Sequence, residues 1–124
     1  MEVPKSLRIW YVIHFFADIL FAIPLFIFPE YTLSLLGFTT IDVVTARLVA
    51  AALIGIGTAS LLQRNNKIES FQSTLTIKVI WSVTAILGLI ISILTNKAPM
   101  LTWLIVLIFV IFSGTWIYYK IKLK

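Results

Sequence analysis

The sequence predicts an all-α integral membrane protein: an antiparallel bundle of four transmembrane helices, with a short interfacial helix between the first two. Of its 124 residues, 60% are hydrophobic and only 12% are charged, which lies far from the composition of soluble domains. The apolar residues form four runs of about 20 residues, the length that crosses a hydrocarbon layer of about 30 Å. These runs lack the alternation of β-barrel strands. We therefore expect one transmembrane domain over residues 1–124.

The predicted spans cover roughly residues 7–28, 43–63, 74–95 and 99–119. Pro29 and Glu30 stop the first span, which we interpret as a retained helix and not a cleaved signal peptide. Asp42 is placed to cap the N-terminus of the second span. Pro99 suits the first turn of the fourth. Residues 64–73 and 96–98 form short connections, so we expect consecutive helices to be antiparallel neighbours.

The segment PEYTLSLLGFTTID between the first two spans is more than a turn. Its apolar positions, with Gly37 as a helix stop, predict a short helix lying in the headgroup region. An alternative interpretation makes this segment a lid over a cavity that opens outward.

The distribution of basic residues orients the predicted bundle, because cytoplasmic loops collect Lys and Arg. Seven basic residues lie outside the spans on one side, and only Lys97 lies on the other; the seven are Lys5, Arg8, Arg64, Lys67, Lys120, Lys122 and Lys124. This predicts a multi-pass protein of the cell (inner or plasma) membrane with both termini in the cytoplasm. The net charge of +5 then reflects topology and lipid anchoring, and no nucleic-acid partner is expected.

Four ionisable residues fall inside the predicted spans, where each costs a few kcal/mol unless it finds a partner. They are His14, Asp18, Arg47 and Lys78. His14 and Asp18 are four residues apart, so they share a helix face and can form a hydrogen bond. We predict that Arg47, on the neighbouring helix, pairs with Asp18. In the alternative interpretation, Arg47 and Lys78 extend to the headgroups.

Small residues recur every four positions on two spans and predict close helix packing. The first stripe contains Arg47, Ala51, Gly55 and Ala59, and the second contains Thr84, Gly88 and Ser92. We expect the second and third spans to cross through these faces, or the faces to pair in a homodimer. Hydroxyl groups such as that of Ser60 can add polarity, although helix hydroxyls usually bond their own i−4 carbonyl.

Chemical motifs are absent from the sequence. It contains no nucleotide-binding, hydrolase or metal-binding pattern, no cysteine and a single histidine, so neither thiolate chemistry nor paired histidine ligation of haem is possible within one chain. We predict no catalytic residue, metal or cofactor, and we favour a protein that is not an enzyme.

The stretch TARLVAAALIGIG, together with the length and the four-span layout, resembles small prokaryotic inner-membrane proteins of the DoxX-like kind. The resemblance implies a prokaryotic inner-membrane location. It carries over no functional residue.

Three functional hypotheses fit the sequence. The protein binds or transports a small amphipathic or ionic solute in a cavity lined by His14, Asp18, Arg47 and Trp81, with His14 coupling occupancy to protons. Alternatively, it is a structural or accessory subunit of a larger membrane complex, and its buried charges fix helix register. Thirdly, it is a quinone-binding or redox-associated subunit. The expected partners are the lipid bilayer, a small or lipid-like ligand, and a second copy or a larger complex.

Overall fold

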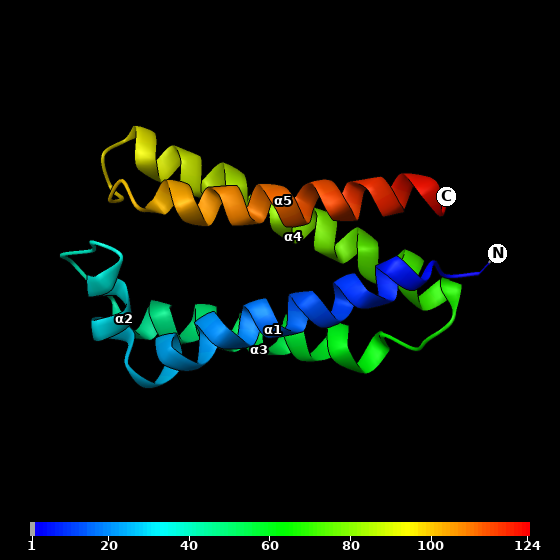
Figure 1. Cartoon of the computed structure of the whole chain (residues 1–124). Coiled ribbons are helices and arrows are strands. Elements are labelled where there is room, and N and C mark those ends of the chain that lie inside the picture. Colours follow the sequence, from blue (N-terminus) through cyan, green and yellow to red (C-terminus); the bar gives the residue numbers. More distant parts are fainter. Residues whose placement is uncertain (1) are drawn as a thin grey trace. The chain divides into compact units, whose positions relative to one another are not determined.

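The computed structural model describes residues 2–124, which are all-α and contain no strand. Five helices follow one another: α1 (Lys5–Ile27), α2 (Pro29–Leu35), α3 (Val43–Gln63), α4 (Ile68–Leu94) and α5 (Thr102–Lys122) (Figure 1). All but α2 are long and apolar enough to cross a membrane, which confirms the four predicted apolar helices. The chain divides into two compact units, Pro4–Asn65 and residues 66–124, with residues 2 and 3 grouped with the second.

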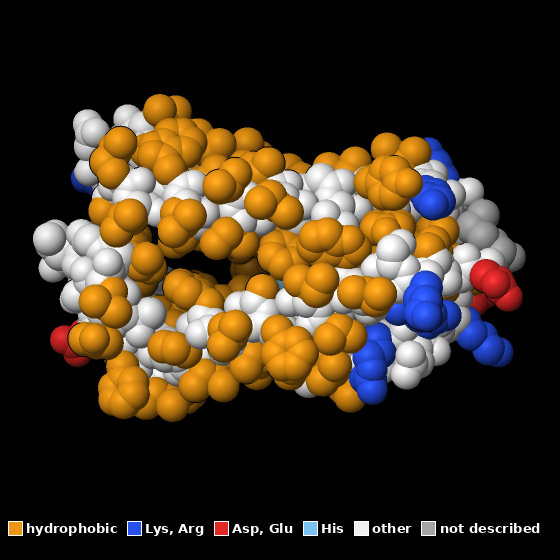
Figure 2. Space-filling view, viewed as in Figure 1, with side chains coloured by type: hydrophobic (Ala, Val, Ile, Leu, Met, Phe, Trp, Pro, Cys, Tyr) orange, Lys and Arg blue, Asp and Glu red, His pale blue; other side chains and the backbone are white. Residues whose placement is uncertain are grey.

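The long helices expose large apolar side chains, as expected of surfaces that face lipid. Leu20 on α1, Leu48 on α3, Ile91 on α4 and Leu107 on α5 are all exposed. Figure 2 shows hydrophobic side chains over most of the visible face of these helices, with Lys and Arg side chains near helix ends. A soluble protein rarely exposes apolar surface of this extent.

In the first unit, α1 and α3 lie side by side and antiparallel (Figure 1). Each helix has one buried stripe whose members are three or four residues apart, the spacing that keeps side chains on one helix face. The stripes are Leu7, Tyr11, His14, Asp18, Ala22 and Leu25 on α1, and Ala46, Ala50, Leu53, Gly57 and Ser60 on α3. The small residues of α3 let the two backbones approach closely.

The face of α3 that packs on α1 differs from the predicted small-residue stripe. Arg47, Ala51 and Gly55 are exposed and Ala59 is half-buried, and a Cβ added at Gly55 would meet no atom within 4 Å. The sequence places small residues on two adjacent faces of this helix, and their spacing alone does not indicate which face packs on α1.

Arginine side chains bond carbonyls near the C-terminal ends of both long helices in this unit. Arg47 Nε donates to the carbonyl of Phe26, near the end of α1, at 3.0 Å. At the other end of the pair, Arg8 Nη1 donates to the carbonyl of Arg64 at 2.7 Å, and Arg64 Nη1 donates to the carbonyl of Leu61. The last carbonyls of a helix lack partners within the helix, and a cation there opposes the negative end of the helix dipole.

Asp42 caps the N-terminus of α3, as predicted. Its Oδ1 accepts hydrogen bonds from the backbone N–H groups of Val44 (3.0 Å) and Thr45 (3.3 Å), and its Oδ2 accepts one from the Thr45 hydroxyl (2.7 Å). The Thr45 hydroxyl, followed by these N–H groups, lowers the pKa of the Asp42 carboxyl from its ordinary value, because all three bonds favour the ionised form.

The short helix predicted between the first two spans is confirmed as α2, and it ends where Gly37 was expected to stop it. Gly37 has a φ of 96°, a left-handed conformation that glycine adopts without steric cost. The N–H of Gly37 bonds the carbonyl of Ser34 (3.0 Å), and the N–H of Phe38 bonds that of Leu33 (3.1 Å). This pair of bonds is the Schellman arrangement. Tyr31 is among the exposed apolar residues of α2.

In the second unit, α4 and α5 form another antiparallel pair (Figure 1). The buried stripe of α4 contains Phe71, Leu75, Lys78 and Ser82, and that of α5 contains Thr102, Val106, Ser113, Trp116 and Tyr119. Near one end of the pair, Gln72 Nε2 donates to the carbonyl of Leu123 at 2.8 Å, and Lys120 Nζ donates to the carbonyl of Gln72 at 3.1 Å. The predicted stripe of Thr84, Gly88 and Ser92 lies off this seam, because Thr84 and Gly88 are exposed and Ser92 is half-buried. Contact between the α3 and α4 stripes, or pairing of either in a dimer, stays a prediction.

The starts of α4 and α5 both differ from the predicted positions. Helix α4 begins at Ile68, six residues before the predicted span, because residues 68–73 are mostly polar but contain no Gly or Pro. Helix α5 begins at Thr102, so the prediction that Pro99 lies in its first turn is wrong. Asn96, at a φ of 59°, ends α4 in a second Schellman arrangement. The carbonyl of Pro99 then accepts the N–H of Thr102 at 3.0 Å in a turn before α5.

Candidate functional site

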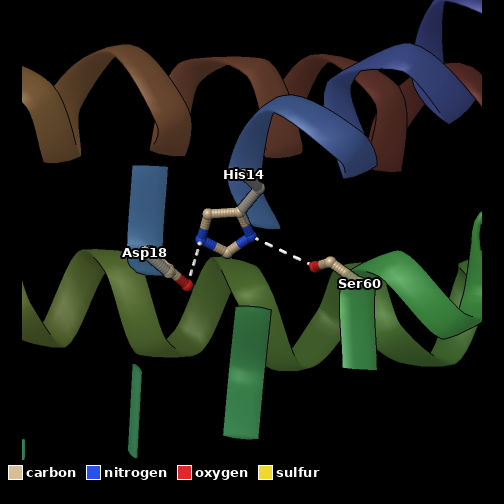
Figure 3. A network of polar contacts seen from close by, with 3 residues as sticks. All are labelled: His14, Asp18 and Ser60. Carbon is tan, nitrogen blue, oxygen red and sulfur yellow. Dashed lines mark hydrogen bonds and ion pairs between the residues drawn. The ribbon is translucent and has the colours of Figure 1, made fainter. Parts of the chain in front are cut away.

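Three buried polar side chains meet between α1 and α3, and we call His14, Asp18 and Ser60 the polar cluster (Figure 3). His14 Nε2 lies 3.2 Å from Asp18 Oδ2, and His14 Nδ1 lies 3.2 Å from Ser60 Oγ. The exposed fractions of His14, Asp18 and Ser60 are 4%, 9% and 1%. The predicted contact between His14 and Asp18 is therefore confirmed.

Helix geometry explains why these three side chains converge. His14 and Asp18 are four residues apart on α1, which stacks their side chains on the face that packs against α3. Ser60 lies on the buried stripe of α3, so its hydroxyl points into the same seam. The sequence indicates Ser60 only as one of the helix hydroxyls that usually bond their own i−4 carbonyl, and its bond to His14 was not predicted.

Gly57 brings the backbone of α3 against Asp18. A Cβ added at Gly57 would lie 2.9 Å from the Cβ of Asp18 and 3.3 Å from its Oδ2. Real Cβ atoms essentially never approach other atoms to less than 3.0 Å. Asp18 is thus held at the level of Gly57 along α3, one turn from Ser60.

The polar cluster can respond to a proton on His14. A neutral imidazole has one donor nitrogen and one acceptor nitrogen. The tautomer with its hydrogen on Nε2, which faces the Asp18 carboxylate, leaves Nδ1 to accept the Ser60 hydroxyl hydrogen. When the ring is protonated, both nitrogens carry a hydrogen, and Ser60 must accept. One proton therefore reverses the direction of the hydrogen bond between His14 and Ser60.

Serine, histidine and aspartate are also the side chains of hydrolase triads, but this arrangement does not support acyl transfer. Such a triad needs a serine oxygen that a substrate carbonyl can reach and separate donors for the oxyanion. Ser60 is only 1% exposed, and it lies within a continuous helix whose backbone N–H groups serve the helix.

Arg47 does not pair with Asp18, which corrects the predicted ion pair. Its guanidinium is exposed, and its Nε bonds the carbonyl of Phe26. Phe26 is eight residues beyond Asp18, or about 12 Å along the helix axis. The antiparallel register therefore places Arg47 too far from the carboxylate, and Gly57 occupies the position opposite Asp18.

Lys78 and Trp81 belong to the second unit. Lys78 is 4% exposed, and its Nζ lies 4.6 Å from the centroid of the Trp116 ring, a cation–π contact. The alternative in which Lys78 extends to the headgroups stays a prediction. The ring of Trp81 packs against Phe109 with centroids 6.2 Å apart.

The described residues, 2–124, contain no group of three or more His, Cys, Asp or Glu side chains that could hold a metal ion. We found no family model, no curated protein and no solved structure that matches the chain. Its function must therefore be argued from the polar cluster.

Proposed function

We propose that this protein is a four-span protein of the cell membrane that binds or transports a small amphipathic or ionic solute, with the polar cluster as its proton-binding centre. In this proposal, the four long helices form a bundle with both termini in the cytoplasm. The seven basic residues on one side and the single one on the other support this orientation, because the cytoplasmic side collects Lys and Arg.

The observation that carries the proposal is that both ring nitrogens of His14 are engaged, one by a carboxylate on its own helix and one by a hydroxyl on another. Ionisable groups within a span are costly and commonly mark ion or proton pathways. A histidine titrates near neutral pH more readily than any other side chain. Occupancy of a nearby site can therefore be linked to a proton on His14.

Charge favours a cation as the solute. Asp18 is the only acidic residue of α1, α3 and α5, and Glu69 lies in the first turn of α4. The Asp18 carboxyl group can bind a proton, and in a low-dielectric setting a carboxylate also attracts an amphipathic organic cation.

A structural role is the second candidate, and the tight contact at Gly57 favours it. Buried polar groups can fix helix register without a ligand, although this role is not general. The distance of 2.9 Å between Cβ of Asp18 and a Cβ added at Gly57 supports this role, because in this register only glycine fits opposite Asp18.

Proteoliposomes separate the two candidates. We would reconstitute the full chain with the pH-sensitive dye pyranine trapped inside, add tetraphenylphosphonium as the amphipathic cation, and add benzoate in a parallel arm. We expect the cation to drive a change in internal pH that protein-free liposomes lack and that Asp18→Asn and His14→Phe abolish. The control variant Ser82→Ala, buried but outside the cluster, should behave as wild type.

The outcome that supports the structural role is equally specific. If tetraphenylphosphonium moves no more protons with the protein than without it, and its binding to the protein has the same pH dependence in wild type and His14→Phe, the proton-binding role is wrong.

A further inference from the structure

The backbone of α3 lies against Asp18 of the polar cluster at Gly57. Among the glycines of α3, α4 and α5, an added Cβ at Gly55, Gly88 or Gly114 would meet nothing within 4 Å, whereas one at Gly57 would lie 2.9 Å from the Cβ of Asp18. Of these four glycines, Gly57 is therefore the one whose missing Cβ avoids a steric conflict.

The displacement that a Cβ at Gly57 would require can be compared with the lengthening that breaks the hydrogen bond between His14 and Ser60. Ordinary contacts begin at 3.4 Å, so a methyl group at Gly57 requires a displacement of about 0.5 Å between the two helices or of the Asp18 side chain. The bond from His14 Nδ1 to Ser60 Oγ is 3.2 Å long, and a separation of about 3.6 Å no longer counts as a hydrogen bond. A shift of this size in α3 is enough to break it.

We propose that Gly57 is the positioning residue of the polar cluster: the absence of a Cβ lets α3 lie against Asp18, which places Ser60 within hydrogen-bond distance of His14. The inference rests on the proposed function, because it assigns Gly57 to the same proton-binding centre. Gly57 touches no solute and acts through Asp18 and Ser60.

The first test reads the imidazole directly in the full chain in lipid nanodiscs. Histidine nitrogen-15 resonances report on Nδ1 of the single His14, and in wild type Ser60→Ala should shift the Nδ1 signal. Gly57→Ala should produce a comparable shift and make the signal insensitive to a further Ser60→Ala change. Gly55→Ala, the same substitution two residues away, should leave both the signal and its response unchanged.

A wild-type Nδ1 signal in Gly57→Ala, still responsive to Ser60→Ala, would overturn the inference. A purely structural effect of the methyl group would lower stability without this change in the Nδ1 signal.

A second test covers the case in which Gly57→Ala folds poorly, and it uses the fact that the conflict involves Cβ of Asp18. Asp18→Ala removes the carboxylate but keeps Cβ, whereas Asp18→Gly removes both. Adding Gly57→Ala should lower the ratio of folded to unfolded protein at least tenfold in the Asp18→Ala background and less than twofold in the Asp18→Gly background. Equal penalties in the two backgrounds would show that the Cβ contact does not position the cluster.

Neither test requires a solute, so the two proposals can fail separately. If the Gly57 results hold while tetraphenylphosphonium moves no protons, only the proposed function is wrong. If proton movement depends on His14 but Gly57→Ala behaves like Gly55→Ala, only the role of Gly57 is wrong.

Discussion

The hydrogen bond between Ser60 and His14 joins α1 to α3, and its removal should destabilise the protein measurably. Ser60→Ala deletes one oxygen from a position that is 1% exposed and takes a partner from His14 Nδ1. Hydrogen bonds between membrane helices contribute about 0.6 kcal/mol on average and up to about 1.7 kcal/mol, and losing the partner of a buried group costs more than the average. We therefore expect a loss of about 1 kcal/mol.

Ser82→Ala is the matched control. Ser82 is also 1% exposed, but its Oγ donates to the Val79 carbonyl of its own helix at 3.2 Å. Ser82→Ala should lower the free energy of unfolding by less than about 0.5 kcal/mol, because alanine favours the helix and the Val79 carbonyl stays within the hydrogen-bonded backbone of the helix. Both variants would be unfolded reversibly by sodium dodecyl sulfate in mixed micelles and followed by circular dichroism. If Ser60→Ala and Ser82→Ala lower the free energy of unfolding by amounts that agree within about 0.3 kcal/mol, the bond between Ser60 and His14 does not stabilise the α1 and α3 pair.

Three further predictions follow from the contacts of charged residues. The lowered pKa of Asp42 means that its cap stabilises α3 above the ordinary carboxyl pKa and that this contribution is lost as pH falls through the folded value. The protection of amides in the first turn of α3, measured relative to their intrinsic exchange rates at each pH, should therefore fall in acid in wild type but not in Asp42→Asn. A double-mutant cycle between Asp18→Asn and Arg47→Leu should give a coupling energy within about 0.5 kcal/mol of zero, since the two side chains are far apart; a coupling of several kcal/mol would restore the predicted ion pair. A cycle between Lys78→Met and Trp116→Leu should give about 1 to 2 kcal/mol, the range for a desolvated cation–π contact, and a value near zero would show that the ring does not hold the ammonium.

Local sequence signals predicted the helices well, because each depends on a few neighbouring residues. The long apolar runs identified four helices, Asp42 and Gly37 carried recognisable capping chemistry, and a spacing of four residues was sufficient to pair His14 with Asp18. The start of α4 was misplaced because hydropathy marks where a helix is apolar and not where it begins. Asn96 is less obvious as a helix stop than Gly37, since asparagine adopts the left-handed conformation less often.

Contacts between helices were predicted less well, because they depend on register, which spacing within one helix does not determine. Two faces of α3 carry small residues, and the predicted stripe is not the face that packs on α1. The face on α1 contains Gly57 and Ser60, and the observed register places Arg47 away from Asp18. One extra constraint, the glycine that must lie opposite Cβ of Asp18, would have corrected the register and revealed the bond between Ser60 and His14.

The reciprocal arginine contacts at the two ends of the α1 and α3 pair bear on how the chain is made. The bonds from Arg47 to the Phe26 carbonyl and from Arg8 to the Arg64 carbonyl use only residues of the unit Pro4–Asn65. A nascent hairpin of α1 and α3 therefore already contains every atom of both contacts. Insertion of this hairpin into the bilayer need not await synthesis of α4 and α5.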